Sequence, residues 1–230
     1  MRLRIAARKT HKWLALLVGL QIVIWSLSGL YMTAVHIDTI HGDHLVRKPL
    51  ERSVDLASLA DPLAVAAGAR SVQLDWIGDR PVYVVTDHNS ERAFDAVSAR
   101  PLPPLSKAEI RKLSVELYTG DEPISSTRLI RDIPGEIRGR KPPLWRVEFD
   151  HWNQPTFYLS PVTGAVITRR HELWRLFDVM WMLHIMDYDE RENVNNWLLR
   201  PFTWAALMLA LSGGWMLIYA FPRRKARASP

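Results

Sequence analysis

Residues 13–35 read WLALLVGLQIVIWSLSGLYMTAV, a run of 23 residues without a charged side chain. As an α-helix this run would be about 34 Å long, enough to cross the hydrocarbon core of a bilayer. A second uncharged run of 21 residues, PFTWAALMLALSGGWMLIYAF, occupies residues 201–221. A buried helix of a soluble protein is the alternative interpretation of each run. Two runs of this length favour two membrane-spanning helices.

The basic residues at the two ends of the chain predict its orientation in the membrane. Residues 1–12 contain five Arg and Lys residues and residues 222–230 contain four, without any Asp or Glu. An excess of Lys and Arg marks the cytoplasmic side, so both termini are expected in the cytoplasm of a bacterial inner-membrane protein. The net charge of +6 then reflects topology, and no nucleic-acid partner is expected. A cleavable signal peptide normally has a shorter apolar core, so we expect an uncleaved anchor in the lipid bilayer.

The polar segment between the runs contains two similar blocks, 65 residues apart. Residues 80–85 (RPVYVV) correspond to residues 145–150 (WRVEFD), and residues 95–102 (DAVSARPL) to residues 160–167 (SPVTGAVI). Each block predicts a strand and then a second strand that is interrupted by a tight turn. The block pattern therefore predicts two related antiparallel units.

Further elements are predicted around the blocks. A helix over residues 58–67 would begin at Asp61 and Pro62, and a helix over residues 106–118 would begin with a capping box of Ser106 and Glu109. Additional strands are expected at residues 71–76 and 125–131, and an exposed loop, rich in Gly, Pro and Arg, at residues 132–143.

The sequence therefore predicts an α+β protein, in which two transmembrane helices flank an extracytoplasmic domain of two degenerate helix-plus-antiparallel-sheet repeats. The predicted boundaries are a basic cytoplasmic N-terminus (1–12), a first span (13–36), a connecting segment (37–54), a first repeat (55–105), a second repeat (106–170), an amphipathic juxtamembrane helix with a linker (171–196), a second span (197–221) and a basic cytoplasmic tail (222–230).

The two repeats resemble the PepSY domain, whose helix-and-sheet unit has a D-x-x-T-G-like turn before its last strand. Residues 160–164 (SPVTG) match this turn with Ser in place of Asp, and residues 95–99 (DAVSA) keep the Asp but lack the Gly. The chain as a whole is similar to the PepSY-associated transmembrane family. The matching motifs, in order, are RKTHKW at 8–13, SGL at 28–30, LH at 183–184 and SGGW at 212–215.

This resemblance implies b-type haem held between membrane histidines, flavin-linked electron transfer, and a role in iron and siderophore reduction. The sequence has no phosphate loop, nucleotide fingerprint or nucleophile–base motif, so no flavin or nicotinamide site is expected in this chain. Electrons would come from a partner, such as a flavin reductase or another membrane subunit. Many relatives have four spans, so a four-helix site would need a homodimer or another subunit.

A different function remains open for the same chain. It would be a non-catalytic tethered PepSY module that binds or regulates an extracytoplasmic protein, as the domain is thought to do in peptidase propeptides. The sheet edges and the basic loop at residues 132–143 would then make the contacts. A scaffold subunit of a membrane complex is a third interpretation.

The chain has no cysteine, which excludes disulfides, iron–sulfur clusters and covalently attached c-type haem. Any metal or haem would therefore be held by His, Met, carboxylate or Tyr side chains. The resemblance implies histidines, and the candidate haem ligands are His184, His36, His11 and His44. His184 shares a predicted helix face with Phe177 and with Met180 or Trp181. It belongs near the outer leaflet, where His36 or His44 would complete an axial pair. The alternative for His184 is a hydrogen-bonded structural role.

His11 and His36 are 25 residues apart, which places them on one face of a continuous helix, with Gly29 between them. The alternatives are an interfacial basic residue for His11 and a capping residue for His36. A second candidate site consists of His41, His44 and Asp38, whose spacing would suit a metal ion if the segment is helical. Gly42 disfavours such a helix. His171 is an alternative haem ligand before the predicted juxtamembrane helix.

Overall fold

The computed structural model describes residues 2–48, 52–88 and 90–220. The protein is α+β, with antiparallel sheets and two helices that are long and apolar enough to span a membrane. It divides into two compact units, which are described separately. We call Met1–His36 with Leu176–Pro230 the helical unit, and Ile37–Arg175 the sheet unit.

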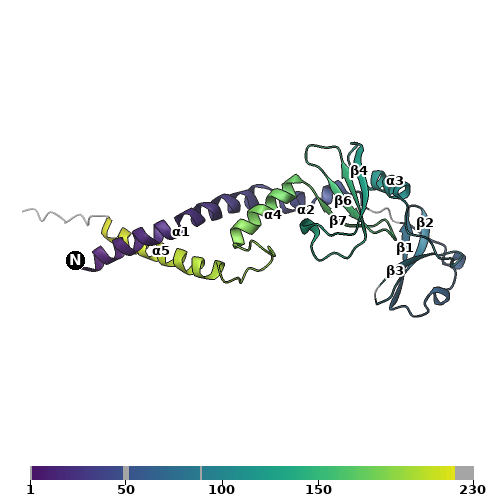
Figure 1. Cartoon of the computed structure of the whole chain (residues 1–230), viewed down its shortest axis with the longest axis horizontal. Coiled ribbons are helices and arrows are strands. Elements are labelled where there is room, and N and C mark those ends of the chain that lie inside the picture. The colour runs from purple at the N-terminus through teal and green to yellow at the C-terminus, as the bar shows by residue number, and fades with distance from the viewer. Residues whose placement is uncertain (1, 49–51, 89, 221–230) are drawn as a thin grey trace, which may run out of the picture. The chain divides into compact units, whose positions relative to one another are not determined.

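Two long helices form most of the helical unit. α1 covers Arg2–Ala34, and α5 covers Leu199–Ala220. Their apolar segments, Arg8–Ala34 and Leu199–Ile218, have 27 and 20 residues and correspond to roughly 40 Å and 30 Å of helix. The two helices pack side by side (Figure 1). The predicted apolar runs are therefore helical over their described residues except Val35, which follows the end of α1, whereas Phe221 lies outside the described residues.

The segment between α4 (Glu172–Ile185) and α5 is a tightly bonded loop. Asp187 accepts backbone hydrogen bonds from Glu192 and Asn193 at 3.1 and 2.9 Å. These bonds, above all that from Asn193, lower the pKa of Asp187. The side-chain oxygen of Asn196 accepts from the backbone N–H of Leu199 at 2.7 Å and so caps α5. These hydrogen bonds therefore hold the linker that the sequence predicts before the second span.

The sheet unit contains two antiparallel sheets (Figure 1). The first, in the order β1-β2-β3, consists of Ser71–Ile77, Arg80–Thr86 and Glu91–Asp95. The second, in the order β4-β5-β6-β7, consists of Ile124–Ile130, Leu144–Phe149, Thr156–Leu159 and Val166–Arg170. Helix α3 (Lys107–Leu117) precedes the second sheet in the sequence and begins with the predicted capping box of Ser106 and Glu109.

The predicted helix over residues 58–67 is wrong. Two short 3-10 turns, η2 (Leu56–Ser58) and η3 (Pro62–Val65), take its place. Asp61 does cap η3, with Pro62 at its first position, as the sequence predicts. Between the turns, the backbone N–H of Ala60 donates to the carbonyl of Ala96 at 2.9 Å. This bond to the sheet competes with a continuous helix, so only the second block has an α-helix.

Each predicted turn between strands is held by its first side chain. Asp95 accepts from the backbone N–H of Ser98 at 2.8 Å, and Ser160 accepts in the same way from Val162 at 3.1 Å. Asp95 ends β3, whereas the Ser160 turn joins β6 to β7, so the interrupted strand of the second block is two strands. Gly164 has a φ of 71°, and a Cβ there would lie 2.5 Å from Leu113 Cδ1.

The insert at residues 132–143 is only partly an exposed loop, which corrects the prediction. Ile137 is 1% exposed and packs with Leu144 and Tyr158 in a small apolar cluster. Residues 138–143 are exposed. The main apolar core lies between α3 and the second sheet and contains Leu45, Leu105, Ile110, Tyr118, Val147, Phe149, Phe157 and Leu159.

Candidate functional site

The imidazole of His184, in the last turn of α4, packs against Ser28 and Gly29 of α1. We call this contact the His184 seat. Nδ1 of His184 lies 2.8 Å from Oγ of Ser28, a residue with 1% exposure. The Ser28 hydroxyl donates its proton to the carbonyl of Ile24 at 2.8 Å, so its oxygen accepts from His184. Nδ1 of His184 therefore carries the hydrogen. Gly29 follows Ser28, and a Cβ there would lie 3.9 Å from His184 Cε1.

The carbonyl end of α4 is held by side chains from other parts of the helical unit. Gln21 donates to the carbonyl of Leu183 at 3.1 Å, and Trp25 donates to the carbonyl of His184 at 2.7 Å. These bonds satisfy carbonyls that the end of a helix leaves unpaired. Since Gln21, Trp25 and Ser28 all belong to α1, one helix fixes both the backbone and the ring of His184.

His11, near the start of α1, packs in the same way against Ser212 and Gly213 of α5. We call this contact the His11 seat. Nδ1 of His11 lies 3.0 Å from Oγ of Ser212 and 3.3 Å from the carbonyl oxygen of Leu209. A carbonyl oxygen only accepts, so Nδ1 of His11 also carries the hydrogen. A Cβ on Gly213 would lie 3.1 Å from His11 Cε1. Alanine at position 213 would therefore push the His11 ring by a few tenths of an ångström.

In the neutral form of each imidazole, the lone pair is then on Nε2. The described buried polar atoms without a hydrogen-bond partner do not include Nε2 of His11 or of His184. Histidine ligands of metals are usually fixed by a hydrogen bond from the other ring nitrogen, as here. Both seats thus fit ligation of a metal or a haem iron through Nε2. Ser28 is 17 residues from His11 along α1, or roughly 26 Å, so the two seats cannot share one iron.

His36 does not belong to the face that carries His11. Helix α1 ends at Ala34, and His36 is an exposed residue beyond it, so the expected common face of His11 and His36 is wrong. Gly29 faces His184 instead. His44 lies in the sheet unit, where its ring centroid is 6.3 Å from that of His171. An axial pair of His184 with His36 or His44 stays a prediction.

The candidate metal residues occupy a short helix and a 3-10 turn. α2 (Ile37–His41) carries Asp38 and His41, and η1 (Asp43–Leu45) carries His44; between them Gly42 has a φ of 71°. Among the described residues, no group of three or more His, Asp or Glu side chains is placed to hold a metal ion. A metal site at Asp38, His41 and His44 stays a prediction.

Nδ1 of His171 accepts hydrogen bonds, whereas Nδ1 of His184 donates one. His171 is fully buried, and its Nδ1 lies 3.3 Å from both Asn153 Nδ2 and the backbone N–H of Trp174, which are donors. Burial lowers the pKa of His171, as do His44 and Arg175, against the carbonyls of Ile40 and Thr39. With Nδ1 as acceptor, the neutral ring carries its hydrogen on Nε2. His171 Nε2 is a buried atom without a hydrogen-bond partner among the described residues, and haem ligation by His171 stays a prediction.

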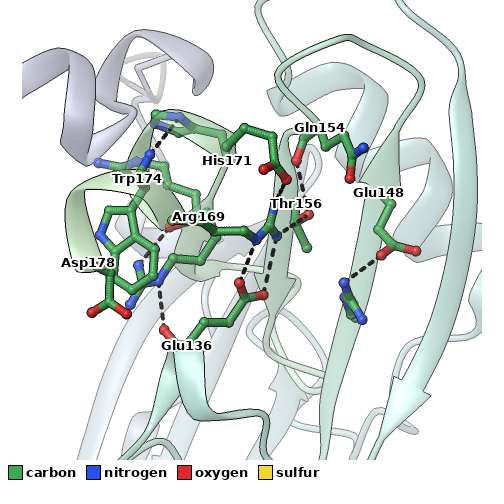
Figure 2. A network of polar contacts seen from close by, with 12 residues as sticks. Glu136, Glu148, Gln154, Thr156, Arg169, His171, Trp174 and Asp178 are labelled. Carbon is green, nitrogen blue, oxygen red and sulfur yellow. Dashed lines mark hydrogen bonds and ion pairs between the residues drawn. The ribbon is translucent and has the colours of Figure 1, made fainter. Parts of the chain in front are cut away.

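A polar network that the sequence does not suggest is centred on Glu136 in the insert (Figure 2). The carboxylate accepts from the buried Tyr158 hydroxyl and from Nε of Arg175 at 2.8 Å. Burial favours a higher pKa of Glu136, but these hydrogen bonds and the charges of Arg175 and Arg146 outweigh it and lower the pKa. Arg170 donates to the Glu136 carbonyl at 2.7 Å. The network fixes the insert to residues 170–175.

Sequence patterns reveal only part of these arrangements. The Ser–Gly pairs and His184 are visible as motifs, whereas the hydrogen bonds join Ser28 to His184 over 156 positions and His11 to Ser212 over 201 positions. Glu136 has no local signal, because its partners lie 22 and 39 positions away.

Comparisons with protein-family models, with curated proteins and with solved structures found no match for this chain.

Proposed function

We propose that the chain is an inner-membrane subunit that carries electrons across the bilayer through b-type haem ligated by His184 and His11. The observation that carries this proposal is the shared hydrogen bonding of the two imidazoles. Each donates Nδ1–H to a serine of a neighbouring helix and keeps its Nε2 lone pair. The resemblance to the PepSY-associated family motivates haem as the ligand and iron chelates or siderophores as acceptors.

The residues around the two seats would orient the ligands. Ser28 and Ser212 would fix the ring planes, while Gly29 and Gly213 let the rings lie against the helix backbone. When bound, haem supplies a one-electron carrier whose potential follows its axial ligands. Each seat offers one imidazole, so a second axial ligand would come from another copy of the chain or from a partner subunit.

The spacing of the seats along α1 supports a transmembrane path. Their separation of roughly 26 Å is close to the thickness of the hydrocarbon core, about 30 Å. One seat would then lie near each leaflet, with both termini in the cytoplasm as the basic ends predict. The sheet unit would be a PepSY-type domain outside the cytoplasm, and a partner would deliver electrons on the inner side.

Electron flow through reconstituted vesicles tests this function. Vesicles that contain the purified protein enclose dithionite, and ferricyanide outside is the acceptor, whose bleaching is followed optically. We expect the rate to fall about ten-fold or more in His184→Ala and in His11→Ala, because either change removes a ligand. His88→Ala, an exposed histidine of the sheet unit, is the control. Equal rates in all four proteins and in empty vesicles would contradict the proposal.

A further inference from the structure

The end of α4 lies beside the stretch of α1 between the two seats. Two of its last carbonyls accept hydrogen bonds from Gln21 at 3.1 Å and from Trp25 at 2.7 Å. Gln21 and Trp25 are 10 and 14 residues from His11 along α1, which corresponds to roughly 15 and 21 Å. Ser28, at the His184 seat, is roughly 26 Å from His11. Along α1, these two bonds therefore lie closer to the His11 seat than Ser28 does.

The start of α5 lies beside the same stretch of α1. Asn196, which caps α5, donates from Nδ2 to the carbonyl of Ile185 at 2.8 Å, so α5 begins next to the end of α4. Leu199, the first residue of α5, is 13 residues from Ser212, which corresponds to roughly 20 Å of helix. Because Ser212 contacts His11, this length agrees with the distance of roughly 15–21 Å along α1. The loop between α4 and α5 therefore begins and ends between the two seats.

Exposed apolar side chains continue on α1 beyond the stretch beside this loop. Val23, within the stretch, is 54% exposed, and Leu27 and Leu30, nearer the end of α1, are 60% and 64% exposed. The apolar segment as a whole continues to Ala34. In a membrane-spanning helix, exposed side chains of this kind face lipid. With the membrane placement in the proposed function, the loop therefore begins and ends within the hydrocarbon core.

The loop is polar although its ends lie at this depth. Residues 187–192 read DYDERE, with four acidic residues and one Arg. Asp189, Glu190 and Glu192 are exposed. Charges and non-helical backbone in the hydrocarbon core are costly unless other protein covers them or water reaches them. A covering protein would have to bury these carboxylates and supply matching cations, which costs more than leaving them hydrated. Water is therefore the favoured environment of the loop.

Contacts with α4 hold the loop in place. Nε1 of Trp181 donates to the carbonyl of Arg191 at 3.0 Å, and the Arg191 side chain forms an ion pair with Asp178. Asp178 is seven residues before Ile185, the last residue of α4, so the loop folds back along roughly 10 Å of this helix. The polar loop is thus fixed to the helix that carries His184.

We propose that the loop between α4 and α5 draws water into the hydrocarbon core and gives small hydrophilic solutes access to the His184 seat. This inference rests on the membrane placement in the proposed function and names the class of electron acceptor. A haem at this seat would pass electrons to a water-soluble acceptor, and no lipid-soluble carrier would be needed on the outer side.

Spin labels on the full chain in lipid nanodiscs test this inference. Since the chain has no cysteine, each substitution gives a single labelling site. Asn195→Cys places a label at the deep end of the loop, Val23→Cys at the same depth on α1, and Leu30→Cys nearer the outer end of α1; all three positions are exposed. Oxygen is concentrated in hydrocarbon, whereas a neutral nickel chelate stays in water. Each probe shortens the relaxation time of a label with which it collides.

We expect the ratio of nickel to oxygen collisions to be at least about two-fold higher at position 195 than at positions 23 and 30. Position 195 would then be hydrated although it lies deeper than position 30, which faces lipid. A low ratio at position 195 would overturn the inference, because the loop would be dry. A high ratio at position 23 or 30 would also overturn it, because the loop would then lie in the aqueous phase outside the bilayer.

A fourth label separates this inference from the function on which it rests. Leu207, in the middle of α5, is 46% exposed and is labelled as Leu207→Cys. A high nickel ratio at this position would show that α5 does not span the membrane, which overturns the membrane placement itself. The labels report hydration whether or not haem is bound. A protein without haem that shows the expected pattern would therefore contradict the electron-transfer function and still support the hydrated loop.

Discussion

Nδ1 of His184 in α4 donates a hydrogen bond of 2.8 Å to Oγ of Ser28 in α1. Ser28→Ala removes the acceptor and frees the ring to rotate. We expect haem affinity at this seat to fall about 10–100-fold, as for other partners of metal-bound histidines. Titration of the detergent-solubilised protein with haemin measures the change. Ser26→Ala is the control, because Ser26 is exposed and its hydroxyl donates to the carbonyl of Ile22 in its own helix. Equal affinities of the two variants would show that Ser28 does not position the ligand.

Gly213 and Gly214 are adjacent in α5 but differ in what surrounds them. A Cβ on Gly213 would lie 3.1 Å from His11 Cε1, whereas nothing lies within 4 Å of a Cβ on Gly214. Gly213→Ala should therefore displace His11 and reduce the haem bound per chain. Gly214→Ala should keep the haem and leave stability unchanged or raise it by about 0.5–1 kcal/mol. Haem content of the purified variants checks this, and identical content in both would argue against the His11 seat.

The ion pair of Glu136 with Arg175 is largely buried, and Glu136→Gln would leave Arg175 with only its half-exposed partner Glu172 among the residues that the structure describes. We expect a loss of about 3 kcal/mol of unfolding free energy, measured by denaturant unfolding of the full chain. Glu116→Gln removes only an exposed pair with Lys112, so a change within about 0.5 kcal/mol is expected. Similar losses in the two variants would contradict the structural role of Glu136.

The same pair predicts a pH dependence. The pKa of Glu136 is lower in the folded protein than the unfolded value of about 4.3, so the unfolded state binds the proton more readily. The stabilisation is fully present above the unfolded pKa and is lost as the pH falls through the folded pKa. Wild type should therefore lose more stability below about pH 4 than Glu136→Gln does. Parallel stability curves for the two proteins over this range would disprove the assignment.

Gly164 and Gly68 both have positive φ, 71° and 74°, but only Gly164 is crowded. Alanine at either position is strained, by about 1 kcal/mol. At Gly164 the added Cβ would also lie 2.5 Å from Leu113 of α3. Gly164→Ala should therefore lower the unfolding free energy by at least about 1 kcal/mol more than Gly68→Ala. A thermal melt of both variants measures the difference, and equal melting temperatures would refute the tight packing of this turn.

The parts of the fold that depend on local sequence were predictable. The two uncharged runs give helices because their length and lack of charge are local properties, and Ser106 with Glu109 caps α3 within a single turn. The helix over residues 58–67 failed because Ala60 bonds to Ala96 in the sheet. Propensity alone cannot anticipate such a distant competitor.

The candidate site was predictable only in its components. His184, His11 and the Ser–Gly pairs stand out in the sequence, but the bonds between them depend on how three helices pack. The prediction that His11 and His36 share one helix face assumed that α1 continues past Ala34, which it does not. Glu136 was missed because its partners Tyr158 and Arg175 lie on a strand and a helix far along the chain.

The absorbance spectrum of the purified protein tests the central claim most directly. Protein extracted in detergent from haem-replete cells should show a Soret band, and its pyridine haemochrome should identify b-type haem. His184→Ala and His11→Ala should each lower the haem content, their combination should abolish it, and His88→Ala should leave it unchanged. A colourless wild-type protein that also fails to bind added haemin, or a double variant with full haem content, would contradict the account.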